Sequence, residues 1–171
     1  AILSTIPLFL HKFHNLKLSD SVEHARHALS LDENRKPFLP TLWDPLPNNL
    51  QNQERIKQIW FSGVHTDIGG GYAEHGLSDI TLNWMIKEAK DKGLLIYSKN
   101  NVEKNIRENV EDTMHDEYKG KFKLTGKAYR SWDHDKYGPP HVHPTAYQRT
   151  KNRQNENLPK YEVKLWYPSQ Y

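Results

Sequence analysis

The residues best suited to chemistry stand in one short string, GVHTDIGGG, at residues 63–71. A histidine directly after a strand can act as a general base, because its pKa lies near neutral pH and the strand fixes its backbone. Three consecutive glycines let main-chain N–H groups approach a substrate closely. We therefore take His65 as the first catalytic candidate and Gly69, Gly70 and Gly71 as a substrate-binding loop. The structural alternative is a tight strand-to-helix turn in which His65 only packs or caps.

This glycine string does not match the known phosphate-binding patterns. A phosphate-binding loop needs Gly-Lys-Ser/Thr, which does not follow these glycines, and a dinucleotide fingerprint needs spaced rather than contiguous glycines. The sequence thus predicts no nucleotide and no other cofactor.

Two carboxylates are candidates to assist His65. Asp32 lies in the string HALSLDENR and could orient the imidazole, as the acid of a Ser-His-acid triad does. The alternative is a helix C-terminus at which Asp32 and Glu33 pair with Arg35, because acids are unfavourable there without a partner. Asp67 is the third catalytic candidate. It lies two residues from His65, and we expect it to shape the loop or to accept hydrogen bonds from nearby backbone.

A metal site is a further possibility in the C-terminal part. A His-x-His pair with nearby carboxylates can bind a divalent ion. The surrounding prolines and the absence of further ligand spacing favour structural or solvent-exposed histidines, so we assign no metal ligand. The residues concerned are Asp133, His134, Asp135, His141 and His143.

A nucleophile is missing from the sequence. A serine hydrolase of the α/β type carries Gly-x-Ser-x-Gly on a strand-to-helix elbow. The nearest string is Gly76-Leu77-Ser78, which lacks the second glycine. Cysteine is absent, which excludes a thiol nucleophile, disulfides and thiolate zinc sites.

The elements that must position these residues follow from periodicity. Residues 56–64 are β-branched and aromatic and predict a strand. An Asp-x-x-Glu capping pair and helical spacing of apolar residues predict a helix over 20–31. The glycines make 65–76 a loop, and a helix is expected from about 79 to 92. A short helix is expected within residues 100–115, through Val102, Ile106 and Val110, and an edge strand over 161–168. Strand, glycine loop and helix in this order are typical of an α/β sheet, whose sites lie at the carboxyl ends of its strands.

Composition sets the remaining bounds. The chain has 171 residues, 36% of them hydrophobic, and a net charge of +3, which is too small to indicate nucleic acid. Its mean hydropathy is −0.90, and no window is long and apolar enough for a membrane span. Residues 1–10 are the most apolar run, but they lack the features of a signal peptide. We expect a soluble chain and assign no compartment.

Three strings of the sequence resemble one known family. RHALSLDENRKPFLPTLW, IWFSGVHTDIGGGYAEHGLSDITLNWMIKEAKDKGL and HVHPTAYQR are similar to segments of an α/β hydrolase-like family, long treated as a domain of unknown function. That family includes the type VI secretion phospholipase effectors. The second string resembles the most distinctive block of the family, and together the strings span nearly the whole chain.

The resemblance implies ester hydrolysis of lipids by a Ser-His-Asp triad. In the family, a Gly-Phe-Ser-Arg-Gly nucleophile and a strand ending in Asp-Thr-Val precede the segments found here. The absence of both, and of an initiating methionine, leads us to expect one partial domain over residues 1–171. It would be the His-bearing C-terminal half of a hydrolase-like domain, with a loop-rich extension over 94–171. The acid would then lie before residue 1, which makes Asp32 the second choice.

Several expectations follow for activity and partners. The chain alone should be inactive, because it lacks the nucleophile. Its partners would be a lipid or other ester substrate, the N-terminal half, or a membrane surface. Two alternatives remain open: a non-catalytic remnant that acts as a binding module, and a metal-dependent hydrolase. The substrate, the acyl preference and the oligomeric state do not follow from the sequence.

Overall fold

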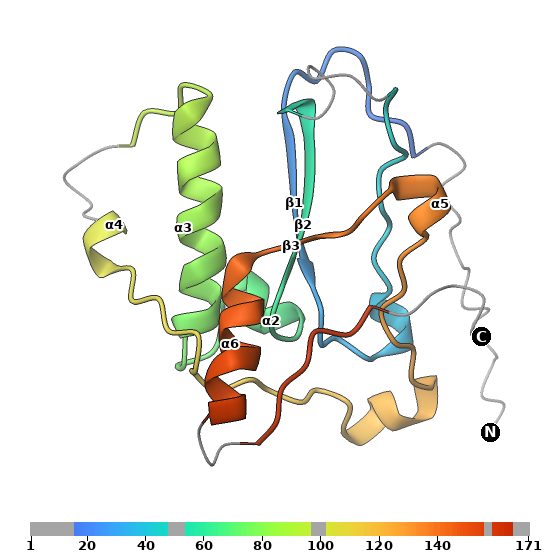
Figure 1. Cartoon of the computed structure of the whole chain (residues 1–171), viewed down its shortest axis with the longest axis vertical. Helices are drawn as coiled ribbons and strands as arrows, with labels where there is room; N and C mark the ends of the chain where they lie inside the picture. The colour runs from blue at the N-terminus through green and yellow to red at the C-terminus, as the bar shows by residue number, and fades with distance from the viewer. Residues whose placement is uncertain (1–15, 48–53, 97–101, 156–158, 166–171) are drawn as a thin grey trace, which may run out of the picture.

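Three short parallel strands form the centre of the molecule, with helices beside them (Figure 1). The computed structural model describes residues 16–47, 54–96, 102–155 and 159–165. In chain order the elements are β1 (Ala25–Ser30), η1 (Lys36–Phe38), β2 (Ile56–Phe61), α2 (His65–Gly69), α3 (Gly76–Asp91), α4 (Val102–Asn105), η3 (Gly120–Thr125), α5 (His134–Tyr137), β3 (His141–Val142) and α6 (Pro144–Asn155). The expected α/β class is confirmed.

The sheet has the strand order β1-β2-β3, and both pairings are parallel. The β1 and β2 strands pair along their full length, from Ala25 opposite Ile56 to Ser30 opposite Phe61. Because parallel strands point the same way, their carboxyl ends share one edge. The residues after β1 and β2, including Asp32 and His65, are therefore brought to the same edge of the sheet.

Adjacent residues of β2 serve opposite faces of the sheet. Trp60 belongs to a buried cluster with Leu29, Leu31, Trp132 and Ala146. Phe61 belongs to a second cluster, which includes Ile68, Leu77 and Ile80. The second cluster lies on the side of α3, and Figure 1 shows α5 on the other side. Alternation along a strand explains why two neighbouring aromatic residues are both fully buried.

The helix predicted over residues 20–31 is wrong, because residues 25–30 form β1. Ala25, Leu29 and Ser30 are buried against neighbouring elements, although the segment contains no β-branched residue. In-register pairing with β2 overrides the local helical spacing. Asp20 does not cap a helix; it lies in a turn, 3.8 Å from the guanidinium of Arg55.

The glycine segment also departs from expectation, because residues 65–69 form the one-turn helix α2 rather than a loop. The Asp67 carboxylate accepts a hydrogen bond from the N–H of Val64 and so satisfies a free donor at the start of this turn. Gly70, at a φ of 83°, then ends it. The glycines terminate the helix instead of preventing it.

The C-terminal part is more ordered than predicted. The α6 helix and the short strand β3 were not expected, whereas the expected edge strand is absent from residues 161–165, which are irregular. The expected helix through Val110 is limited to α4, and α3 begins three residues before the predicted start. The apolar run at 1–10 and the end of the expected strand, 166–168, lie outside the described residues.

Gly63, which links β2 to α2, provides a test of this geometry. Its φ is 121°, and a Cβ atom there would lie 2.5 Å from Cβ of Asp67. We expect Gly63→Ala to lower the free energy of unfolding by more than about 2 kcal/mol, through backbone strain and overlap. Gly69→Ala is the matched control, since Gly69 has open space around it and should change stability by about 0.5 kcal/mol or less. Equal urea midpoints for the two variants would contradict the geometry.

Candidate functional site at the carboxyl edge of the sheet

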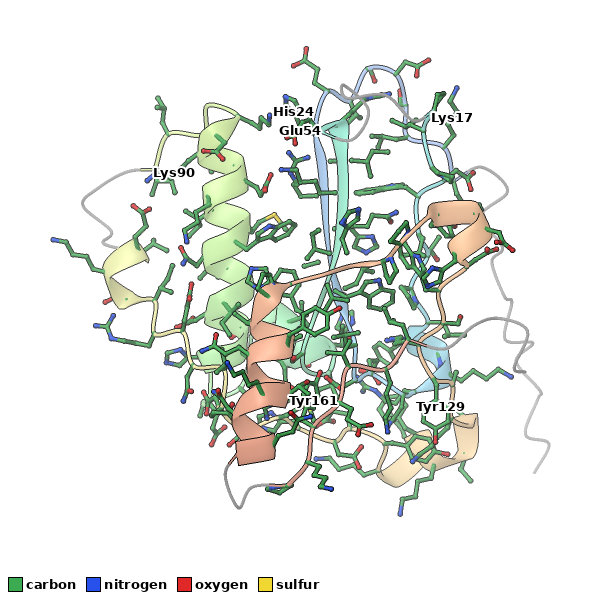
Figure 2. All side chains as sticks on the ribbon, in the orientation of Figure 1. Lys17, His24, Glu54, Lys90, Tyr129 and Tyr161 are labelled. Carbon is green, nitrogen blue, oxygen red and sulfur yellow. The ribbon has the colours of Figure 1, made fainter. Side chains whose placement is uncertain are left out.

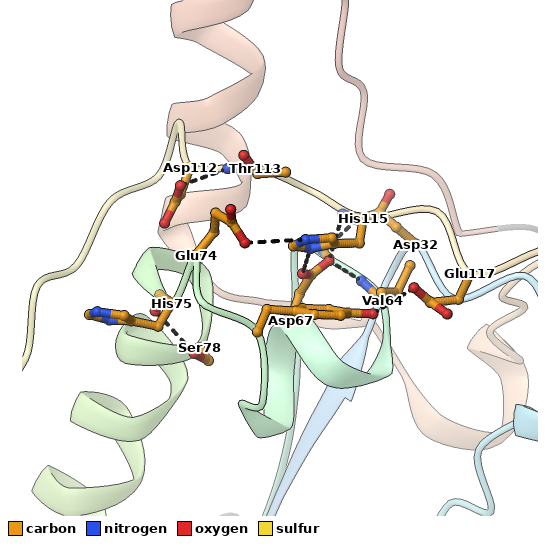
Figure 3. Close-up of polar contacts among 12 residues, drawn as sticks. Asp32, Val64, Asp67, Glu74, His75, Ser78, Asp112, Thr113, His115 and Glu117 are labelled. Atoms are coloured by element: carbon orange, nitrogen blue, oxygen red, sulfur yellow. Dashed lines mark hydrogen bonds and ion pairs between the residues drawn. The ribbon is translucent and has the colours of Figure 1, made fainter.

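A buried carboxylate and a histidine form a hydrogen-bonded pair at the carboxyl edge (Figure 3). Oδ1 of Asp67 lies 2.7 Å from Nδ1 of His115, and Oδ2 accepts the backbone N–H of the same histidine at 3.1 Å. Asp67 is 2% exposed, whereas the His115 side chain is 20% exposed. A carboxylate that accepts from Nδ1–H leaves Nε2 as the basic nitrogen, which is the arrangement of a general base and its orienting acid.

Neighbouring side chains hold this imidazole in place. The ring of Tyr72 stacks on His115 with 3.6 Å between centroids, and the Tyr72 hydroxyl donates to Glu117 at 2.8 Å. Burial, followed by the bond to Glu117, raises the pKa of the Tyr72 hydroxyl, which therefore stays a donor at neutral pH. Nε2 of His115 lies 3.7 Å from a carboxylate oxygen of Glu74, a half-exposed surface residue. The basic nitrogen thus faces the more open side of the pair.

His65 lies at the same edge but has a different environment. Its backbone N–H donates to Glu33 at 3.3 Å, and its exposed ring meets Phe38 edge-on, with centroids 5.4 Å apart. Among the described residues, no carboxylate bonds to its imidazole. The structure therefore brings His65 to the expected edge without giving it an orienting acid.

Asp32 connects strand ends. Its Oδ2 accepts the N–H of Gly63 at 2.6 Å and the hydroxyl of Tyr161 at 3.1 Å. Its own N–H donates to the carbonyl of Gly63 at 3.1 Å, which extends the β1–β2 pairing beyond the strands. Burial raises the pKa of the Asp32 carboxyl, although both hydrogen bonds and Arg149 act in the opposite direction.

The pairing expected of Asp32 and Glu33 with Arg35 exists for Glu33 alone. Two Arg35 side-chain nitrogens donate to the Glu33 carboxylate at 2.8 and 2.5 Å, and the Arg35 backbone N–H adds a third bond. Burial would raise the pKa of the Glu33 carboxyl, but the bonds from Arg35 outweigh it and lower that pKa. Glu33 and Arg35 therefore form a structural ion pair. The pair follows the strand β1 and not, as was expected, the C-terminus of a helix.

A cleft of about 580 Å³ opens beside this edge, between β1, α2 and α3. The three glycines 69–71 form one wall and His65 lies on its rim. Its apolar lining includes Ala28, Ile68, Leu82 and Met85. Leu82 is 42% exposed, because it lines this space. The lining also carries polar side chains, among them Arg26, His27, His75 and Asp79. A cleft that combines apolar surface with convergent polar groups is the usual form of a small-molecule site.

The five C-terminal residues considered as metal ligands do not gather. The ring of His143 stacks on Phe61 and its Nδ1 lies 2.8 Å from the hydroxyl of Thr145, while Asp133 accepts the N–H of Lys136 at the start of α5. Within the described ranges, no three histidine or acidic side chains come together as a metal site. In the same ranges, no helix has the length and apolar character needed to cross a bilayer.

Sequence reasoning missed His115, Tyr72 and Glu117. His115 lies 48 residues after Asp67, within a stretch that was predicted to be helical, and no local spacing connects the two. The only available signal was the pairing rule itself: a buried acid directly after a strand needs a partner.

The fold and site define an α/β protein with an acid–histidine pair and an apolar cleft at the carboxyl edge of a parallel sheet. Comparison with family models identifies the family to which the chain belongs. The model of the Tle1-like phospholipase effector catalytic domain of the type VI secretion system matches residues 3–88, and the chain belongs to that family. No curated protein and no solved structure matches the chain. The matched region contains both Asp67 and His65 but ends before His115.

The raised pKa of Asp32 predicts how stability depends on pH. The folded state binds the proton more tightly than the unfolded state, so stability falls as pH rises from the ordinary value of 3.8 toward the raised one. Asp32→Asn keeps an acceptor for Gly63 and should flatten this dependence above the ordinary pKa of 3.8. Asp32→Ala leaves the Gly63 N–H without its acceptor and should cost about 1–3 kcal/mol. Denaturant curves against pH test this; equal losses in both variants would contradict it.

Proposed function

We propose that the chain carries the acid–base half of a serine-type hydrolase that cleaves ester bonds of phospholipids. Membership of a phospholipase effector family supports the lipid substrate. The observation that carries the proposal is the 2.7 Å contact between the buried Asp67 and His115 at the carboxyl edge. In this proposal the 171 residues are one partial domain of a hydrolase-like sheet, and the nucleophilic serine lies outside them.

The chemistry assigns one step to each atom of the pair. Nδ1–H of His115 donates to Asp67, which fixes the ring and stabilises its protonated form. Nε2 accepts the serine proton while the serine oxygen bonds to the ester carbonyl carbon. The same proton then passes to the departing alcohol, and water repeats the exchange to release the fatty acid.

The apolar cleft provides a place for the acyl chain. Ala28, Ile68, Leu82 and Met85 offer apolar surface, and glycines 69–71 form a wall without side chains. His65 on the rim would contact the ester end of the lipid. This role follows from its position and differs from the base role that the sequence suggested.

The first test concerns the nucleophile. Because the sequence contains no Gly-x-Ser-x-Gly, the 171-residue chain should not hydrolyse a p-nitrophenyl ester or a phospholipid above background. A longer polypeptide that includes the preceding coding sequence should hydrolyse both, and a fluorophosphonate should label its serine. Turnover by the 171-residue chain that a fluorophosphonate abolishes would contradict the proposal.

The second test distinguishes the two histidines in that longer polypeptide. His115→Gln should lower kcat by a factor on the order of 10³ or more, and Asp67→Asn by a similar factor, because each breaks the base–acid unit. His65→Gln should act mainly on KM, through substrate contacts at the rim. Thermal melts exclude loss of folding. If His65→Gln removes kcat while His115→Gln retains it, the base is His65.

A further inference from the structure

A basic surface lies next to the candidate site. Residues 116–127 carry four exposed lysines, and a fifth, Lys36, lies on η1 beside them. Two acids, Asp116 and Glu117, stand in the same stretch; Glu117 accepts from the Tyr72 hydroxyl and also pairs with Lys119 at 3.3 Å. The surface therefore has an excess of positive charge. We call it the basic rim; it consists of Lys36, Lys119, Lys121, Lys123, Leu124 and Lys127.

The rim also presents apolar surface at its centre. Leu124, in the last turn of η3, is 90% exposed between Lys123 and Lys127. Leu39, which follows η1, is 48% exposed. Exposure of a large apolar side chain to water is unfavourable. An exposed leucine among lysines is favourable against a partner whose surface is charged and whose interior is apolar.

Aromatic packing fixes the rim to the carboxyl edge. Phe122 of η3 packs edge-on against Phe38 at 5.8 Å, and Phe38 meets His65 at 5.4 Å. The Arg35 guanidinium lies 3.9 Å from the Phe38 centroid and 4.7 Å from that of Phe122. Two backbone bonds, from Lys36 to Gly126 and from Ala128 to Asn34, complete the attachment. The rim and the site thus belong to one packed unit.

We infer that the basic rim binds the surface of an anionic phospholipid bilayer and holds the carboxyl edge of the sheet against it. Lysines near such a surface attract its negative headgroups, and Leu124 enters the boundary between headgroups and acyl chains. The inference deepens the proposed function, because it rests on phospholipid as the substrate. The cleft and the Asp67–His115 pair then lie within reach of lipids in the layer that the rim contacts.

A second exposed leucine pair offers an internal comparison. Leu94 and Leu95, beyond the end of α3, are 53% and 94% exposed, and Lys90 and Lys92 lie near them. This end of α3 lies far from η3 in Figure 1, and Figure 2 shows Lys90 on the opposite side of the molecule from Tyr129, which follows η3. It also lies away from the carboxyl edge. Exposed leucines beside lysines therefore occur at both places. The basic rim differs from the end of α3 in that it lies next to the carboxyl edge.

The experiment measures binding of the 171-residue chain to vesicles of ether-linked phosphatidylglycerol and phosphatidylcholine. Ether lipids cannot be hydrolysed at an ester, so binding is measured separately from activity. We expect co-sedimentation with the mixed vesicles, none with pure phosphatidylcholine, and weaker binding as salt rises above about 0.1 M, because salt screens exposed charges.

Matched variants locate the surface. Lys121→Ala/Lys123→Ala should weaken vesicle binding by about fivefold for each lysine removed. Leu124→Ser should weaken it further without changing charge. Lys87→Ala/Lys92→Ala removes the same charge from exposed positions on and after α3 and should change binding less than about twofold. Circular dichroism confirms that each variant is folded.

Each contrary result has a definite meaning. Failure of the native chain to bind anionic vesicles, or equal binding to phosphatidylcholine, overturns the inference. Loss of binding in the α3 pair with retention in the rim pair overturns it in favour of the other end of α3. Binding to a DNA duplex but not to vesicles identifies a nucleic-acid surface instead. Vesicle binding through the rim, with no hydrolysis by the longer polypeptide, leaves the rim established and the proposed function wrong.

Discussion

Buried negative charge at the carboxyl edge is the constraint on which the rest of the structure depends. Glu33 and Asp67 are buried there and Asp32 is half-buried beside them, and a carboxylate removed from water costs several kcal/mol unless it is paired and hydrogen-bonded. Each carboxylate has different hydrogen-bond partners. Asp67 accepts from backbone N–H groups and a histidine, Glu33 from a bidentate arginine, and Asp32 from a backbone N–H and a tyrosine hydroxyl. Arg35 and Val64 are close to their acids in sequence, whereas Gly63, His115 and Tyr161 come from segments 31 to 129 residues away from theirs. Satisfying the acids therefore gathers those segments at one edge.

The same compensation connects the site to its surroundings. Arg35 neutralises Glu33 and also lies against Phe38 and Phe122, so one side chain joins the end of β1 to η3. Asp67 joins α2 to the segment that carries His115. A substitution that releases Glu33 would disturb the contacts of Arg35 with η1 and η3, and one that releases Asp67 would free the His115 imidazole.

The spacing of apolar residues predicted β2 and α3 correctly. It failed for β1, whose conformation depends on pairing with another strand. The strand before His65 and the long helix after it follow from apolar periodicity, and both are present as β2 and α3. The β1 segment contains Ala25 and Ala28 at helical spacing, and only the neighbouring strand makes it extended. The short helix α2 depends on a carboxylate that accepts from its own first turn. Placement of Asp32 and His65 at one edge follows from the parallel strands, whereas the partner of Asp67 could not be found because 48 residues separate it from His115.

Exposure separates the roles of the two histidines. A general base needs a fixed ring, one nitrogen held by a buried acceptor and the other open to substrate. This is the ground for the role proposed for His115: Asp67 is almost completely buried, Tyr72 stacks on the ring, and Nε2 lies 3.7 Å from the half-exposed Glu74. His65 has an exposed ring with an aromatic neighbour, which suits contact with a ligand that enters the cleft. Position after a strand leads to this edge of the sheet, and in the proposed function orientation by a buried acid distinguishes His115 from His65 on it.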